Sequence, residues 1–262
     1  MQSKSSNSQG DTLLSLATHE LRTPLSVIKW YTEMLLDGDC GELTGDQIKY
    51  LKTIQASNQR AIDLIKALLN VSRLDLGTFS INPTEVDLRT LVKQVLDEHS
   101  SNLQEKNLHV EETYEGSVPG MIPTLNADKQ LCLVIIRNLV NNAISFSHND
   151  GSIHVEIHEK KQGEEYGKKV IKEDSLVLSV ADSGIGIPEE DKEKIFSKLF
   201  RAGNVPSENT NGSGLNLYIT KEIIEYVGGD IWFESTRDVG STFFIAFPKY
   251  KKQKKEGRTI ID

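Results

Sequence analysis

The chain has 262 residues, of which 37% are hydrophobic and 26% are charged, a composition typical of a folded globular protein. Its apolar runs are far shorter than the roughly 20 residues that a membrane-spanning helix needs, no signal peptide opens it, and a formal net charge of −8 argues against nucleic acid as a partner. We therefore expect a cytoplasmic protein with no membrane span in this chain, built from one small helical domain and one ordinary globular domain.

The two ends and the cysteines contribute little to the functional assignment. Residues 1–10 predict a flexible leader, and the basic residues 249–262 predict a flexible tail. Cys40 and Cys132 lie far apart without metal-ligand spacing, which favours two reduced thiols.

Residues 11–76 predict two long antiparallel helices joined by the turn DGDCGELTGD. Each helix carries one apolar stripe with the spacing of a packed helix face. The stripes comprise Leu14, Ala17, Leu21, Leu25, Ile28 and Leu35 in the first helix and Ile48, Leu51, Ile54, Ile62, Ile65, Leu68, Leu69 and Ser72 in the second. Two helices cannot bury both stripes on each other, so we expect two copies to form a dimeric four-helix bundle.

His19 lies on the side of the first helix away from its apolar stripe, with Thr23 one turn later on the same outward face. A neutral imidazole there is nucleophilic near physiological pH, and Glu20 could take its proton. Pro24 predicts a kink, because it lacks the N–H that would bond the carbonyl of Glu20. For a single exposed histidine, a solvated side chain without a role is the alternative.

Residues 77–87 predict a linker with a first strand, and residues 88–248 predict a second domain, a two-layer sandwich of helices and mostly antiparallel strands. The expected helices cover residues 88–106, 128–146 and 215–227. The expected strands cover residues 108–114, 152–159, 175–182, 229–235 and 241–248, with a charged hairpin at 160–174.

Two groups of residues in this second domain predict a ligand site. Asn138 and Asn142 share one face of a strongly apolar helix, where an unpaired buried amide costs roughly 1–3 kcal/mol, so both need partners, either a ligand or neighbouring backbone. Asp182 ends an apolar strand, and Gly184 and Gly186 follow it. A carboxylate there can accept a hydrogen bond from an exocyclic amino group such as that of adenine, beside backbone that a ligand can approach closely.

A second glycine pair, Gly212 and Gly214, directly precedes a helix, where backbone N–H groups suit phosphate. The run KIFSKLFRAGN before it predicts a mobile lid, with an ordinary amphipathic turn as the alternative. The apolar anchors and cations of this lid are Phe196, Lys198, Phe200 and Arg201. Gly240 and Thr242 begin the last strand.

Taken in this order, the motifs His-Glu-x-x-Thr-Pro, the paired-asparagine helix, Asp-x-Gly-x-Gly, the phenylalanine-rich lid and Gly-x-Gly-Leu-x-Leu resemble the catalytic core of bacterial two-component sensor histidine kinases, from about residue 11 to residue 248. The resemblance implies a histidine-phosphotransfer and dimerisation hairpin followed by an α/β ATP-binding domain. That domain is of the type shared with gyrase, the ninety-kilodalton heat-shock chaperone and mismatch-repair ATPases.

The resemblance also implies roles for the residues of the first helix and of the asparagine helix. His19 is the expected phosphoacceptor, Glu20 its general base, and Thr23 the residue that positions water when the same face dephosphorylates a response regulator. Asn142 is expected to hold Mg²⁺, and Asn138 to support the phosphates of ATP.

The remaining expected nucleotide contacts follow along the chain. Asp182 reads adenine, with Phe146 nearby and with Gly184 and Gly186 shaping the pocket, and Thr242 lines its adenine end. The expected phosphate-side residues are Arg201 at the γ-phosphate and Gly212, Gly214 and Leu215 where the lid closes.

The chain departs from the family pattern in three ways. Ser145 replaces the usual Lys or Arg three residues after the second asparagine, which lowers ATP affinity or transfer rate unless Lys198, Arg201 or Arg137 substitutes. Asn216 replaces the middle glycine of the last motif, which is expected to stiffen the lid. No sensor precedes the hairpin, so we expect either a fragment or a signal delivered by a partner.

The expected function is Mg²⁺-ATP-dependent phosphorylation of His19 and transfer to an aspartate of a response regulator, with phosphatase activity as well. An apolar patch of Val27, Trp30 and Met34 on the His19 side is the expected docking surface for the regulator, unless these residues pack on the second helix or the ATP-binding domain. A nucleotide-binding scaffold that hardly transfers phosphate and a phosphatase-dominant regulator are the alternatives.

Overall fold

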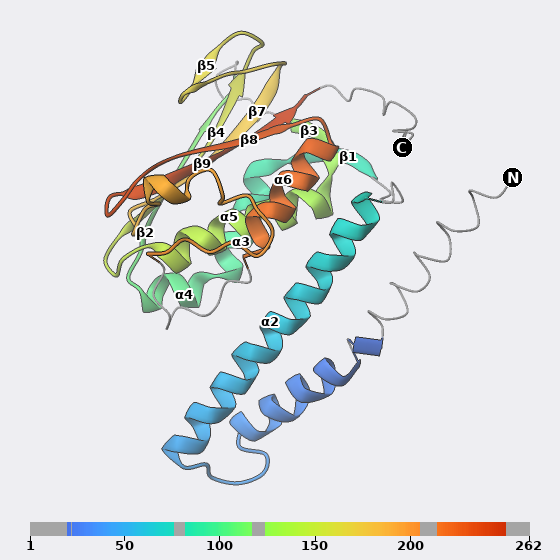
Figure 1. Cartoon of the computed structure of the whole chain (residues 1–262), viewed down its shortest axis with the longest axis vertical. Coiled ribbons are helices and arrows are strands. Elements are labelled where there is room, and N and C mark those ends of the chain that lie inside the picture. The colour runs from blue at the N-terminus through green and yellow to red at the C-terminus, as the bar shows by residue number, and fades with distance from the viewer. Residues whose placement is uncertain (1–19, 22, 76–81, 117–123, 205–213, 250–262) are drawn as a thin grey trace, which may run out of the picture. The chain divides into compact units, whose positions relative to one another are not determined.

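The computed structural model describes residues 20–21, 23–75, 82–116, 124–204 and 214–249. These fall into two compact units, of which the first contains the helical hairpin together with residues 194–201 and 214–219, and the second contains the sheet domain. Each unit is described separately below. Figure 1 shows the order of the elements along the chain.

The helical hairpin consists of a first helix that ends at residue 36 and of α2 (Gly45–Asp75). Gly38 and Gly41 in the connecting turn have φ of 86° and 105°, the left-handed conformation that glycine adopts without strain. A capping box starts α2: the Thr44 N–H donates to Gln47 Oε1 at 2.8 Å, and the Gln47 N–H donates to Thr44 Oγ1 at 3.3 Å.

Within a single hairpin, the predicted apolar stripes are only partly covered. Leu25 and Leu35 are half-buried, but Leu21 and Ile54 are 52% and 47% exposed. This partial exposure in one copy agrees with the prediction that two helices alone cannot bury both stripes on each other.

Two polar residues are instead buried within the hairpin. Asn58 Nδ2 donates to the Leu25 carbonyl at 2.8 Å, and the Thr32 hydroxyl donates to carbonyls of its own helix. The hydrogen bond from the Asn58 side chain fixes the register of the two helices, because a buried amide that loses its hydrogen-bond partner destabilises the fold.

The second unit contains a five-stranded sheet with the strand order β2-β4-β7-β9-β8 and a small sheet of β1 and β3. The main-sheet strands are β2 (His109–Glu115), β4 (Ser152–Lys160), β7 (Ser175–Asp182), β8 (Asp230–Thr236) and β9 (Gly240–Pro248). The small sheet consists of β1 (Pro83–Asp87) and β3 (Thr124–Asp128). Only the pairing of β2 with β4 is parallel among these strands of the described chain.

Helices cover one face of this sheet (Figure 1). They are α3 (Leu88–Glu98), α4 (Ser100–Glu105), α5 (Lys129–Phe146) and the C-terminal part of α6 (Asn216–Tyr226). The side chains of Asp87 and Asp128 accept the first free N–H groups of α3 and α5, which explains where these helices begin. The single helix predicted for residues 88–106 is wrong, because the chain leaves helical geometry at His99, before two serines that favour a helix start over a helix interior.

The domain core lies between the helices and this face of the sheet. Alternate residues of β4, among them Ile153 and Val155, are fully buried, as are Ile136 and Leu139 of α5. This alternation is the period of two that the sequence shows at residues 152–159.

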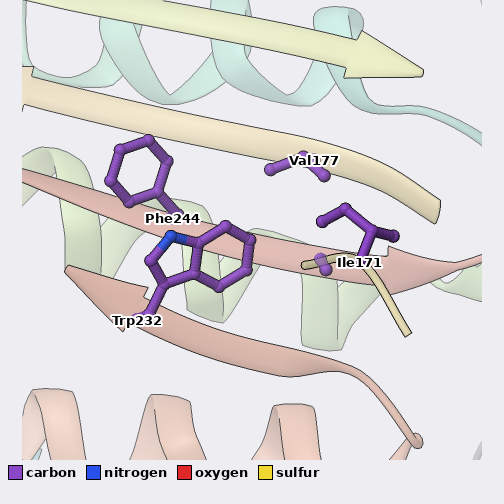
Figure 2. Packing of buried hydrophobic residues seen from close by; sticks show 5 residues of the cluster. Ile171, Val177, Trp232 and Phe244 are labelled. Atoms are coloured by element: carbon purple, nitrogen blue, oxygen red, sulfur yellow. The ribbon is translucent and has the colours of Figure 1, made fainter. Parts of the chain in front are cut away.

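The other face of the sheet carries its own small apolar cluster (Figure 2). The hairpin of β5 (Glu165–Tyr166) and β6 (Lys169–Val170), within the predicted segment 160–174, brings Ile171 and Tyr166 onto it. The other members of the cluster are Val177, Trp232, Phe244 and Ala246. The charged hairpin is thus packed against the sheet through two apolar side chains.

Candidate nucleotide site

Asp182 lies at the end of β7, opposite Ser241 on β9. One carboxylate oxygen, Oδ1, accepts the N–H of Gly184 at 3.0 Å and the N–H of Ser241 at 3.3 Å. Within the described chain, the second oxygen, Oδ2, has no hydrogen-bond donor. Burial raises the pKa of Asp182 to about 6, against the two backbone donors that lower it. The carboxylate therefore offers one open acceptor in a mostly buried setting.

The glycines after Asp182 are required by close backbone contacts. A Cβ on Gly184 would lie 2.2 Å from the Phe146 carbonyl oxygen, and one on Gly186 would lie 2.0 Å from the Thr236 carbonyl oxygen. Gly186 also has a φ of 60°. Because a side chain at either position would displace backbone, the loop has to be glycine at both.

The C-terminal end of α5 is joined to this loop. The Ile185 N–H donates to the Phe146 carbonyl at 3.2 Å, and Ser147 forms an isolated bridge with Gly184. Phe146 itself is half-buried. The structure therefore brings the predicted pocket residues Phe146, Gly184 and Asp182 together.

The two asparagines of α5 have different surroundings. Asn138 Nδ2 donates to the hydroxyl of Thr220, a fully buried residue of α6, at 3.0 Å. Asn142 is half-buried, and its amide makes no hydrogen bond with any residue that the structure describes. The protein itself thus supplies a partner for Asn138, whereas the Asn142 amide is open to a ligand.

On β9, the residue that meets Asp182 is Ser241 and not Thr242, the residue predicted to line the adenine end. Ser241 is buried and places its N–H on Asp182, while Thr242 pairs with Ala181. Since successive side chains of a strand alternate, Thr242 lies on the face that carries Phe244, away from the helices. The motif Gly-Ser-Thr offered two hydroxyl residues, and only the strand register distinguishes them.

Asn204 also escaped the sequence analysis. Its Nδ2 donates to the carbonyls of Ile185 and Gly186 at 3.2 and 3.0 Å, and the neighbouring Gly203 N–H donates to Asp191 Oδ2 at 2.8 Å. These bonds tie residues 203–204 to the loop after Asp182 and to Asp191. An asparagine in a glycine-containing loop gave no signal of this role.

The predicted lid residues belong to the first unit. The Lys198 ammonium lies 4.9 Å from the centre of the Tyr218 ring, Leu215 is buried, and Arg201 is exposed. Gly214 has a φ of 67°, and a Cβ there would lie 2.6 Å from the Phe200 carbonyl oxygen. Gly212 lies outside the described residues.

On the first helix, Thr23 is exposed, as predicted, and Glu20 is exposed as well, whereas His19 lies outside the described residues. Val27 and Trp30 are exposed and Met34 is half-buried. The Trp30 ring contacts that of Tyr31, with 5.1 Å between the ring centres.

The structure supports no all-protein metal site, since no group of three or more His, Cys, Asp or Glu side chains in the described ranges could hold a metal ion. Mg²⁺ in nucleotide sites is typically held by one or two protein oxygens together with phosphates and water. The open amide of Asn142 fits that pattern. In the same described ranges, no helix has both the length and the apolar character needed to cross a membrane.

The fold defines the class of protein: a helical hairpin precedes a two-layer domain in which a half-buried carboxylate, Asp182, stands beside a glycine-containing loop. Two family models match the chain, "His Kinase A (phospho-acceptor) domain" at residues 11–77 and "Histidine kinase-, DNA gyrase B-, and HSP90-like ATPase" at residues 127–251. The chain therefore belongs to the two-component sensor histidine kinases and carries their catalytic core.

Relatives agree with this assignment. The chain is 28% identical to the sensor histidine kinase WalK of Bacillus subtilis over 91% of its own length and 36% of that protein. It is 31% identical to the sensor protein GacS of Pseudomonas syringae over 94% of its own length and 26% of that protein. The chain thus spans only about a quarter to a third of these curated relatives.

Solved structures share the fold. Full-length ShkA in complex with AMPPNP has a TM-score of 0.69 at 23% identity, covering 92% of this chain and 46% of that one. Histidine kinase ThkA in complex with the response regulator TrrA has a TM-score of 0.57 at 25% identity, covering 91% and 61%.

Proposed function

We propose that this chain uses Mg²⁺-ATP to phosphorylate its own His19 and passes the phosphoryl group to an aspartate of a response-regulator receiver. The observation that carries the proposal is the Asp182 carboxylate, which has one oxygen fixed by two backbone N–H groups and the other open. An adenine amino group is a donor that fits this open acceptor. The match of the chain to both a phosphoacceptor and an ATPase family model supports the same reaction.

In this proposal the adenine end of the pocket consists of Asp182, Gly184, Gly186 and Phe146, with Ser241 in place of Thr242. Asn142 would hold Mg²⁺ through its amide oxygen, and the ion would neutralise charge on the phosphates. Asn138 supports that end of the site through α5.

The transfer step follows from the chemistry of imidazole. A ring nitrogen of His19 attacks the γ-phosphorus, the bond from that phosphorus to the bridging oxygen breaks, and ADP leaves while the ring proton passes to Glu20. Arg201 is the proposed γ-phosphate contact, with Gly212, Gly214 and Leu215 where the lid closes. The reaction requires that the His19 imidazole be accessible first to ATP and then to the receiver.

The exposed apolar residues of the hairpin support two partners. Leu21 and Ile54 are exposed in one copy, and we propose that a second copy covers them in a four-helix bundle. Val27, Trp30 and Met34 form the proposed receiver surface. ThkA, which was solved with its response regulator, provides a precedent for such a complex. With these partners, the proposed location of the reaction is the cytoplasm.

Thr23 supports dephosphorylation as a further activity of the same helix. Its side chain is on an exposed helical position, four residues after His19 in the sequence, where the hydroxyl can orient water toward a receiver phosphoaspartate. A Thr23→Ala variant that still accepts phosphate but dephosphorylates the receiver as fast as the parent chain would refute this role.

The central test is incubation of the purified chain with γ-labelled ATP and Mg²⁺, beside His19→Ala and Asp182→Asn. We expect an acid-labile, base-stable phosphoryl adduct on the parent chain, none on His19→Ala, and little on Asp182→Asn. A parent chain that binds ATP but takes up no label would favour the scaffold or the phosphatase-dominant regulator.

A further inference from the structure

The end of α5 is held by a lysine from a distant part of the chain. The Lys106 ammonium donates to the carbonyls of Ile144, Ser145 and Ser147 at 2.7, 3.0 and 3.1 Å. The last carbonyls of a helix have no partner within the helix, and they carry the negative end of its dipole. The last turn of α5 contains no basic residue of its own, so Lys106 supplies the missing cation.

The position of Lys106 is itself fixed. It follows α4 directly, and its carbonyl accepts the Asp150 N–H at 2.9 Å. Asn107, the next residue, donates to the Asp150 carboxylate at 2.7 Å. The ammonium therefore projects from an anchored backbone, and its three N–H groups are all engaged by α5 and the residue after it.

Lys106 binds the C-terminal end of α5, which contacts the loop of the proposed adenine pocket. Phe146 lies between the carbonyls of Ser145 and Ser147, and its own carbonyl receives the Ile185 N–H of the loop after Asp182. Loss of the ammonium would leave the α5 carbonyls unpaired and let Phe146 and the loop shift together.

Lys106 is not a phosphate contact that replaces the basic residue missing at Ser145. Arg137, one of the cations that we considered as a replacement, donates to both Glu98 oxygens at 2.8 Å. The positive charge near Ser145 is instead the Lys106 ammonium, which binds backbone and has no N–H left for a phosphate.

We infer that Lys106 is a positioning residue for nucleotide binding, which sets the α5 end and the Asp182 loop in place without touching the nucleotide. This inference rests on the proposed function. Because the pocket end that it supports is common to ATP and ADP, its loss weakens both nucleotides by the same factor.

The test uses the full chain with Lys106→Met, which keeps much of the side-chain stem, and Lys106→Gln, which keeps two donors without the charge. The control is Lys249→Met, which removes another partly buried lysine, the partner of Glu159. Dissociation constants for ATP and ADP are measured by calorimetry, and amide exchange is followed at Ser147 and Ile185.

We expect Lys106→Met to weaken ATP and ADP equally, by about tenfold, and to speed exchange at both amides. Lys106→Gln should give a smaller change in the same direction, and it decides the question if Lys106→Met does not fold. Lys249→Met should leave both constants unchanged. Unchanged affinity in the Lys106 variants, or equal losses in the Lys249 control, would overturn the inference. Failure of the parent chain to bind either nucleotide would instead refute the proposed function.

Discussion

Arg137 of α5 and Glu98 at the end of α3 form a bidentate ion pair, with Nε and Nη2 each 2.8 Å from a carboxylate oxygen. The guanidinium holds the pKa of Glu98 at about 2, well below its ordinary value of 4.5. Both side chains are more than a third exposed, so solvent weakens the pair. The pair links α3 to α5. Because the guanidinium of Arg137 is bound to Glu98, we do not count Arg137 among the phosphate ligands.

We predict that Arg137→Met destabilises the chain by about 1 kcal/mol without changing ATP affinity. The lowered pKa of Glu98 means that the native state binds its proton more weakly than the unfolded state. The pair therefore stabilises the fold fully above pH 4.5 and loses this effect as pH falls toward 2. Urea unfolding at pH 7 and pH 3, together with ATP calorimetry, checks both parts. A large loss of ATP affinity would restore Arg137 as the substitute for the missing basic residue.

The apolar cluster under the β5–β6 hairpin predicts a stability effect separate from nucleotide binding (Figure 2). Ile171 is only 3% exposed, and Trp232 and Phe244 stack with 5.2 Å between ring centres. Ile171→Ala should cost about 2–4 kcal/mol of unfolding free energy. Nucleotide affinity should be unchanged, because Asp182 and the glycine loop do not depend on this cluster. The exposed Val170→Ala is the matched control and should have almost no effect in urea unfolding.

Trp30 is 57% exposed on the first helix and tests the proposed receiver surface. Trp30→Ala should slow phosphotransfer to the cognate receiver at least tenfold, since a central aromatic anchor contributes about 2 kcal/mol or more to an interface. Autophosphorylation at His19 should persist, because the substitution lies outside the nucleotide pocket. Tyr50→Ala removes another exposed aromatic residue, from α2, and serves as the control. Transfer rates that are equal in all three chains would contradict the assignment of this surface.

The sequence was informative where local rules decide the structure. The strands at 152–159 and 175–182 were predicted to within a residue. Residues 152–159 alternate between apolar and polar side chains, and residues 175–182 form a short, mostly apolar run that ends at Asp182. Asp182 and its glycines were singled out by their order with the other motifs, because Asp-x-Gly-x-Gly alone is also common in turns.

What the sequence could not give depends on contacts distant along the chain. Ser241 and Thr242 are chemically similar, and only the register of β9 against β7 decides which one meets Asp182. Lys106 resembled any surface lysine until the fold brought it to the end of α5, and Asn58 resembled any helix-surface amide. Pairing of this kind follows from tertiary packing and leaves no periodic signal.

Asp182 predicts opposite effects on stability and binding. Its raised pKa, about 6 against an ordinary 3.8, means that the native state holds the carboxyl proton more tightly than the unfolded state. The protonated carboxyl therefore contributes its full stabilisation below about pH 4. This stabilisation is lost as the pH rises through 6, because the half-buried carboxylate is then charged. Asp182→Asn keeps an acceptor for the Gly184 and Ser241 N–H groups without the charge, so it should stabilise the chain by about 1–2 kcal/mol at pH 8 and by little at pH 4.

Binding should change in the other direction. Because the adenine amino group donates to the ionised carboxylate, ATP affinity of the parent chain should fall as pH drops from 7 to 5. Asp182→Asn should bind at least tenfold more weakly at pH 7.5 and lack this component of the pH profile. The phosphate groups of ATP titrate identically with both chains, so the ratio of the two dissociation constants isolates Asp182. If the ratio of the two dissociation constants stays constant from pH 5 to pH 8, the Asp182 carboxylate does not bind the adenine amino group.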